Sequence, residues 1–217
     1  MVAAGVSLAA FAPAALASPS PRQLTGTQLA SALLPASYFP AGYKVERSDT
    51  YNSGGRLEQG PARYNIATMS CKAFNNAFGK KGFGESAIAT NFLSDTQGNN
   101  SGSLRLAAFG QLVYQFRTPG LATGFFRALP GAFVRCQPIV GLGLRILRAA
   151  PVDGHPAFQI NATTSSVPVK NSEILLVSAA GPDLFITAQI SLNESPPSSP
   201  TARTVLAKLI PHVLAFR

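Results

Sequence analysis

The chain is poor in the residues that most often carry catalysis or bind metals. Its 217 residues include two histidines, two cysteines, nine acidic residues and no tryptophan. His155 and His212 are isolated, and no Cys-x-x-Cys pair or closely spaced histidines occur. Because a protein metal site needs several such ligands, often near one another in sequence, we predict that the chain binds no metal.

The acidic residues are scattered, which argues against acid–base hydrolysis. Several lie near predicted loops or strand ends, where solvated carboxylates are the default interpretation: Asp49, Glu58, Glu85, Asp95, Asp153 and Asp183. An acid and a histidine come close in Asp153-Gly154-His155-Pro156, whose composition is also that of a tight turn. No Gly-x-Ser-x-Gly motif occurs for a serine nucleophile. We predict a protein that is not an enzyme and has no cofactor, with an unrecognised hydrolase as the least favoured alternative.

The charge is sparse and basic. There are 18 Lys and Arg residues against nine Asp and Glu, for a formal net charge of +9. Such a balance favours acidic partners, but the cations are dispersed and no basic run with interleaved aromatics appears. We therefore predict no nucleic-acid binding and a weak attraction to an anionic cell envelope.

The N-terminal segment is typical of a secretory signal peptide. Val2–Leu16 is uncharged and ends near Ala15-Leu16-Ala17, a small-x-small cleavage pattern. The basic residues that usually open such a signal are missing. A membrane anchor and a buried helix are the alternatives, although the run is shorter than the about 20 residues of a membrane span. We predict a signal peptide over 1–17, a linker over 18–23 and one domain over 24–217, with no stable membrane span after signal removal.

The two cysteines are expected to form a disulfide in an exported chain. Cys71 and Cys136 lie 65 positions apart, and closing such a loop stabilises a fold by roughly 4 kcal/mol in the chain-entropy model. We predict that both cysteines lie on the apolar stripes of two facing helices and that their sulfurs meet in the interior.

Hydrophobic periodicity predicts an α+β fold with a single, largely antiparallel sheet flanked by helices. Helices are expected at Thr25–Leu34, with Thr25 or Thr27 as the cap, at Asn65–Gly79, at Thr118–Cys136 with a kink or break at Pro130-Gly131, and from Pro200 onward with a bend at Pro211. Strands are expected at Tyr43–Arg47, Glu85–Ser94, Leu104–Phe116, Leu142–Ala149, Ala157–Thr164, Glu173–Ala180 and Leu184–Leu192. In the third of these strands Gln111 and Gln115 alternate with apolar residues, which predicts a half-buried sheet with one polar face.

Aromatic residues cluster in the irregular N-terminal third, where they are candidates to line an apolar cleft between sheet and helices. The candidates are Tyr38, Phe39, Tyr43, Tyr51 and Tyr64. Filling of the core by the same side chains is the alternative, and the favoured one.

The layout resembles the secreted sensor-like domains of actinobacteria, including the extracellular domain of PknH-type Ser/Thr kinases and related exported proteins and lipoproteins. The stretches that carry the resemblance are LTGTQLASALLPASYFPAGYKV, ATMSCKAF and FRTPGLATGFFRALPGAFVRC. It implies a helix-flanked, largely antiparallel sheet with a ligand-sensing cleft. The extracellular domain of these kinases has two disulfides, whereas this chain has cysteines for one.

These observations together predict a secreted or cell-envelope protein, monomeric, that binds rather than catalyses. The expected partner is a small apolar or amphipathic ligand or an envelope protein. A protein for contact with envelope proteins or the cell wall is the alternative.

Overall fold

The computed structural model describes residues 22–52, 66–77, 83, 85–95, 106–136, 142–164, 171–192 and 200–217. The predicted signal peptide over 1–17 lies outside these residues, as does most of the linker. Among the helices of the described part, none combines the length and apolar character needed to cross a membrane.

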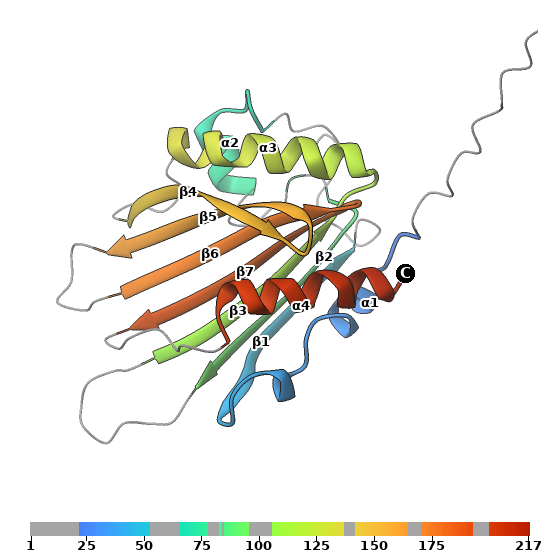
Figure 1. Ribbon diagram of the computed structural model, residues 1–217. Helices are drawn as coiled ribbons and strands as arrows, with labels where there is room; N and C mark the ends of the chain where they lie inside the picture. The colour runs from blue at the N-terminus through green and yellow to red at the C-terminus, as the bar shows by residue number, and fades with distance from the viewer. Residues whose placement is uncertain are drawn as a thin grey trace, which may run out of the picture.

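Seven antiparallel strands form one sheet in the order β1-β2-β3-β7-β6-β5-β4 (Figure 1). The strands are β1 Tyr43–Asn52, β2 Ala87–Asp95, β3 Leu106–Gln115, β4 Leu142–Val152, β5 His155–Thr164, β6 Asn171–Ala180 and β7 Asp183–Leu192. The helices are α1 Gly26–Ser31, the short η1 Ala36–Tyr38, α2 Cys71–Asn76, α3 Pro119–Cys136 and α4 Ala202–Ala215. This is the predicted fold class.

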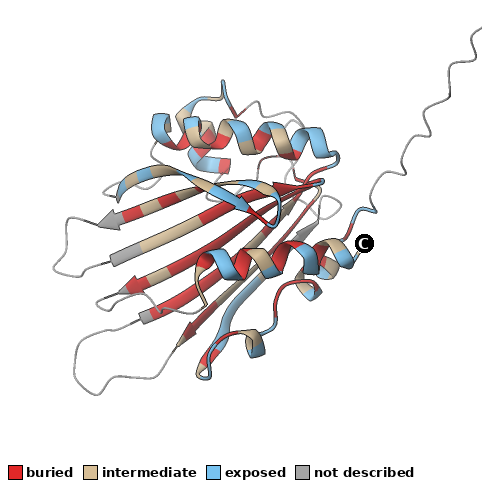
Figure 2. Cartoon of the chain, in the orientation of Figure 1, coloured by how far each residue is buried: buried red, intermediate tan, exposed pale blue. Residues whose placement is uncertain are grey.

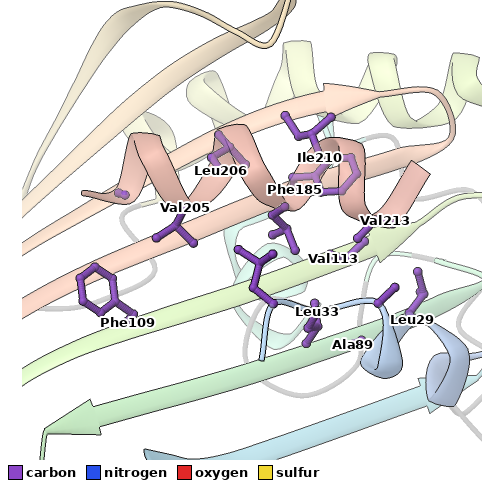
Figure 3. Packing of buried hydrophobic residues seen from close by; sticks show 14 of the residues in the cluster. Leu29, Leu33, Ala89, Phe109, Val113, Phe185, Val205, Leu206, Ile210 and Val213 are labelled. Carbon is purple, nitrogen blue, oxygen red and sulfur yellow. The ribbon is translucent and has the colours of Figure 1, made fainter. Parts of the chain in front are cut away.

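Helices cover both faces of the sheet, so the prediction of a half-buried sheet was wrong. On one face α1 and α4 pack around Phe109 and Phe185 (Figure 3), and on the other face α2 and α3 pack around Phe74 and Ile160. The alternating polar residues of β3 are therefore buried, and Gln111 and Gln115 are both fully inaccessible to solvent. Figure 2 shows buried residues along the central strands and exposed residues on the outer sides of the helices.

Side-chain caps determine where two of the short helices begin. Thr25, one of the two predicted caps, accepts a hydrogen bond from the Gln28 backbone N–H, and the Gln28 side chain accepts one from the Thr25 N–H. This reciprocal capping box starts α1, which ends at Ser31 rather than at Leu34. Ser70 caps α2 through the Ala73 N–H. The helix predicted over Asn65–Gly79 is therefore shorter, because Ala67 lies in an exposed turn.

The long helices continue through their prolines. We expected a kink or break at Pro130-Gly131, but α3 runs unbroken from Pro119 to Cys136. An interior proline costs about 3 kcal/mol through a lost hydrogen bond and a steric clash. Leu129, Ala132 and Phe133 are buried on either side of Pro130, and this burial offsets the cost. In the same way α4 continues past Pro211 with Ile210 and Val213 buried.

A disulfide joins Cys71 and Cys136, as predicted, with the two Cα atoms 4.9 Å apart. Cys71 is the first residue of α2 and Cys136 is the last residue of α3. Both cysteines are half-buried. The expectation that the sulfurs meet in the interior was therefore wrong, and the bond instead ties together two helix ends at the edge of the core.

The segment that combined an acid with a histidine is a hairpin turn. Asp153 and Gly154 both have positive φ angles, 49° and 75°, and they connect β4 to β5. This is the two-residue turn for which Asp-Gly is a preferred sequence. His155 is the first residue of β5.

Candidate functional site

An open hollow lies between η1 and the outer side of α4. Its volume is about 480 Å³, and it is lined by Tyr38, Pro200, Thr204, Ala207 and Lys208. Tyr38 ends η1, while the other lining residues lie just before α4 or on its first two turns. The volume falls in the range of small-molecule sites, about 300–1,000 Å³.

The hollow offers an aromatic ring and a cation to a ligand. The Tyr38 hydroxyl donates a long hydrogen bond to the Thr204 carbonyl oxygen, at 3.4 Å. Lys208 is exposed, and its ammonium group forms no ion pair with any residue in the described part of the chain. Pro200, Ala207 and the Tyr38 ring supply apolar surface. The arrangement can hold an amphipathic molecule by its apolar part and its anionic group.

The structure brings together three of the aromatic residues predicted to line a cleft. The Phe39 ring lies 5.3 Å and the Tyr43 ring 5.5 Å from the Phe109 ring, and both side chains are buried. Tyr38 packs edge-on against Phe39 at 5.5 Å and remains partly exposed. Phe39 and Tyr43 thus fill the core on the α1 and α4 face, and Tyr38 reaches the hollow. Tyr64 and the side chain of Tyr51 lie outside the described residues.

A second, smaller hollow lies on the other side of the first turn of α4. Its volume is about 250 Å³, and it is lined by Gln159, Ile174, Leu176, Gln189, Thr201, Ala202 and Arg203. Several of its polar groups are already bonded. The Gln189 side-chain oxygen accepts from the Ala202 N–H at 3.1 Å, and Arg203 donates to the carbonyl oxygens of Ala150 and Pro151. The larger hollow therefore has more to offer a polar ligand.

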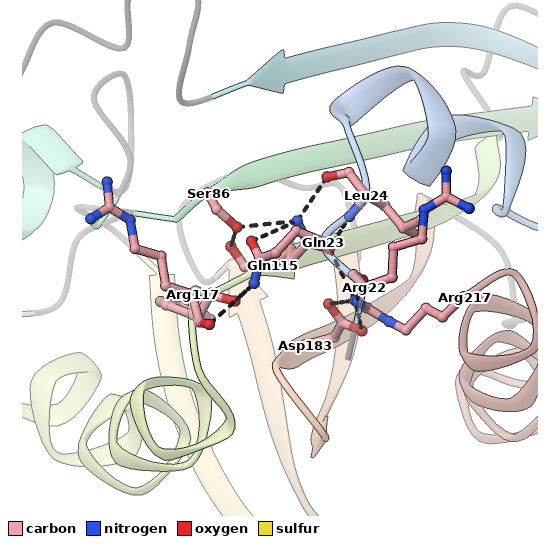
Figure 4. Close-up of polar contacts among 9 residues, drawn as sticks. Arg22, Gln23, Leu24, Ser86, Gln115, Arg117, Asp183 and Arg217 are labelled. Carbon is pink, nitrogen blue, oxygen red and sulfur yellow. Dashed lines mark hydrogen bonds and ion pairs between the residues drawn. The ribbon is translucent and has the colours of Figure 1, made fainter. Parts of the chain in front are cut away.

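Polar side chains on β7 hold α4, and with it the wall of both hollows, against the sheet. Thr187 donates to the Ala202 carbonyl oxygen at 2.8 Å, at the start of the helix where Gln189 also binds. After the helix ends, the Arg217 guanidinium contacts both carboxylate oxygens of Asp183 at 2.6 Å and the Gln115 side chain at 3.0 Å (Figure 4). The helix is thus fixed at both ends.

Two glutamines of β3 fix the segment before η1 in a similar way. The Gln111 amide accepts from the N–H and donates to the carbonyl oxygen of Leu34, each at 3.0 Å. The Gln115 amide makes the same pair of bonds with Leu24, each at 2.8 Å. These bonds satisfy backbone groups on both sides of α1 that burial would otherwise leave unpaired. Since Tyr38 follows this segment, the glutamines also help to position the hollow.

Sequence reasoning missed this polar layer because it assigned Gln111 and Gln115 to a solvent face. The missing signal lay in the predicted amphipathic helices at both ends of the domain. Their apolar faces require a sheet face to bury against, and polar residues on that face then bind helix ends.

Two acids that were expected to be solvated are buried. Glu85 is 2% exposed and its side chain accepts from the Phe83 N–H at 2.6 Å, while Asp183 is fully buried. Burial raises the pKa of Asp183 to about 6, although the neighbouring Arg217 guanidinium opposes the shift. Burial also raises the pKa of Glu173. Burial, and to a smaller extent the Glu85 carboxylate, raises the pKa of Tyr114.

The described part of the chain shows no cluster of metal-ligating side chains. No group of three or more His, Cys, Asp or Glu residues there is arranged to hold a metal ion. His155 starts β5 and His212 lies on α4. The hollow beside Tyr38 and Lys208 is the candidate site that the geometry favours.

The chain is similar in fold to a known extracellular domain. No protein-family model and no curated protein matches it. The crystal structure of the extracellular domain of PknH from Mycobacterium tuberculosis superposes with a TM-score of 0.57 at 14% sequence identity. The match covers 89% of this chain and 98% of that domain. The likeness at this identity establishes a shared fold.

Proposed function

We propose that this protein is a non-enzymatic, sensor-like binding domain of the cell envelope, secreted by means of its N-terminal segment. The fold that it shares with an extracellular kinase domain supports this function. The disulfide between Cys71 and Cys136 fits an oxidising compartment.

The ligand is a small amphipathic anion that occupies the hollow between η1 and α4. The observation that carries this assignment is an exposed lysine, Lys208, beside a partly exposed tyrosine, Tyr38, in a hollow of about 480 Å³. The apolar part of the ligand packs on Tyr38, Pro200 and Ala207. Its anionic group pairs with the Lys208 ammonium.

The proposal can be tested with two single-chain lipids that differ in head-group charge, lysophosphatidylglycerol and lysophosphatidylcholine, as monomers. Isothermal titration should show tighter binding of the anionic lipid. Lys208→Gln should weaken that binding about tenfold, because a hydrogen bond to a charged group is lost, and should leave the weaker binding of the zwitterionic lipid unchanged. Tyr38→Ala should weaken both.

Lys44→Gln is the matched control, because it removes the same charge from an exposed lysine on β1 that does not line the hollow. It should leave both affinities unchanged. No binding of either lipid, or binding that survives both Tyr38→Ala and Lys208→Gln, would refute the assignment of the hollow. If an envelope protein is recovered with the wild-type chain and is lost with Tyr38→Ala, the partner of the hollow is a protein and not a lipid.

A further inference from the structure

One long stretch of the chain has basic residues and no acidic ones. Between Asp95 and Asp153 there is no aspartate or glutamate, whereas six arginines occur: Arg105, Arg117, Arg127, Arg135, Arg145 and Arg148. The stretch includes β3, α3 and β4. A charge distribution of this kind gives one part of a protein a positive potential.

The fold places several cations on the side of the sheet that α2 and α3 cover. Arg127 and Arg135 lie on α3, Arg148 lies on the edge strand β4, and Lys72 lies on α2, and all four are exposed. Arg148 is paired with Phe158 in the sheet, and Phe158 belongs to the core that α3 covers, so Arg148 is on the α3 side. We call Lys72, Arg127, Arg135 and Arg148 the basic α3 surface.

Acidic residues do little to neutralise the basic α3 surface. Neither α2, α3 nor β4 contains an acid. Of the nearby acids in the described residues, Glu85 is buried, Glu173 is half-buried on the sheet, and Asp153 is confined to the β4–β5 turn. The opposite sheet edge differs, because on β1 Lys44 and Arg47 alternate with Glu46 and Asp49, and Arg47 pairs with Asp49 at 2.6 Å.

The same helix exposes apolar side chains. Val134 is 66% exposed and Leu121 is 50% exposed, which makes them two of the large apolar side chains most open to solvent in the described chain. Val134 lies two turns from Arg127 and therefore on the same side of α3. Gly124 and Gly131 lie on that side too and have no side chains, so Arg127 and Val134 protrude from it. Figure 2 shows the outer side of α3 exposed.

Arg135 links the end of α3 to the segment that precedes α2. Its guanidinium donates to the carbonyl oxygens of Ile66, Ala67 and Met69, next to the disulfide that joins α2 to α3. The Arg135 charge is thus paired with carbonyl groups, and no carboxylate in the described residues forms an ion pair with it.

We propose that the basic α3 surface rests on an anionic phospholipid bilayer, with α3 lying along the head groups. Charge complementarity selects the anionic lipid, and a bilayer interface also accepts exposed apolar side chains such as Val134. A soluble polyanion would satisfy the arginines and leave the apolar side chains in water. In this orientation the hollow beside Lys208, on the other face of the sheet, is directed away from the bilayer.

Co-sedimentation with vesicles tests the proposal. The wild type should bind vesicles made of equal parts phosphatidylglycerol and phosphatidylcholine, should bind pure phosphatidylcholine poorly, and should be released by salt. Arg127→Gln should weaken the partition coefficient about fivefold, and Arg127→Gln combined with Arg148→Gln about 25-fold. Val134→Ser should weaken binding without changing its dependence on salt.

Lys44→Gln is the matched control, because it removes one exposed positive charge at the far edge of the sheet. Both Lys44→Gln and Lys208→Gln should change vesicle binding less than about twofold. Far-UV circular dichroism of each variant verifies that it is folded. Equal binding to neutral vesicles, no binding at low salt, or a loss in Lys44→Gln as large as in Arg127→Gln would overturn the proposal. The proposal would also be overturned if soluble polyglutamate bound as tightly as the vesicles and if Val134→Ser did not change that binding.

Discussion

Asp183 and Arg217 form a buried ion pair. Whether removing the Asp183 charge raises or lowers the stability of the protein depends on whether the desolvation cost of the pair exceeds the attraction between its charges. Asp183 is fully buried and Arg217 is 8% exposed, and their contact atoms are 2.6 Å apart. Asp183→Asn removes the negative charge and keeps a side-chain oxygen that can accept from the guanidinium. If desolvation dominates the pair, the variant should be the more stable protein. If attraction dominates, breaking the pair should cost about 3–5 kcal/mol.

The raised pKa of Asp183 indicates that the desolvation cost of its charge exceeds the attraction to Arg217. Burial raises this pKa from 3.8 to about 6 even with Arg217 in contact. Because the folded pKa lies above the unfolded value, the contribution of Asp183 to stability is fully present below about pH 4 and is lost as the pH rises through about 6. The difference in pKa corresponds to about 3 kcal/mol. Asp183→Asn should therefore be more stable than the wild type by up to about 3 kcal/mol near pH 7 and by less than about 1 kcal/mol near pH 4.

Urea unfolding followed by far-UV circular dichroism suits this test, because the chain has no tryptophan to serve as a fluorescent probe. The free energies of unfolding of wild type and Asp183→Asn are compared at several pH values, so that other titrating groups cancel. A variant that is destabilised by 3 kcal/mol or more near pH 7, with a difference that does not change with pH, would refute the dominance of desolvation.

Three further predictions concern stability. Gln111→Met should lower the free energy of unfolding by about 3 kcal/mol, because it leaves the buried N–H and carbonyl group of Leu34 without partners. Gln159→Met, at a half-buried position, is the control and should lower it by less than about 1 kcal/mol. Similar losses in both variants would contradict the role given to Gln111. Gly124→Ala and Gly131→Ala should each raise the free energy of unfolding by about 1 kcal/mol, since both positions are helical and an added Cβ meets nothing within 4 Å. Gly110→Ala should lower it, because its Cβ would lie 3.1 Å from the Ala188 Cβ; thermal unfolding compares the three, and a Gly110→Ala protein as stable as the wild type would contradict this packing.

Local chemistry was predictable where it depends on neighbouring residues. Thr25 was one of two residues predicted to cap the first helix, and Asp153-Gly154 was predicted as a turn, because caps and positive-φ turns select residue types within a few positions. The disulfide was predictable because the chain has two cysteines. Helix ends were less predictable, since Ser70 starts α2 later than the apolar stripe indicated.

The candidate site was predictable only in part. Tyr38 was among the aromatics expected at a cleft, but Lys208 was not, because 170 positions separate the two residues. Their proximity follows from the packing of η1 and α4 on the same face of the sheet. The same packing places Phe39 and Tyr43 in the core and leaves Tyr38 at the surface.

The sequence by itself determined the approximate positions of the helices and strands, the strand-rich α+β class and the disulfide partners, because periodicity, capping and cysteine count are local or compositional properties. The tertiary structure decided that β3 pairs with β7, that both sheet faces are covered, and that Gln111, Gln115 and Asp183 are buried. A polar residue in a strand looks the same in sequence whether water or a helix end is its partner. Only the docking of α1 and α4 distinguishes the two, since burial then requires each polar side chain to bind a backbone group or a charge.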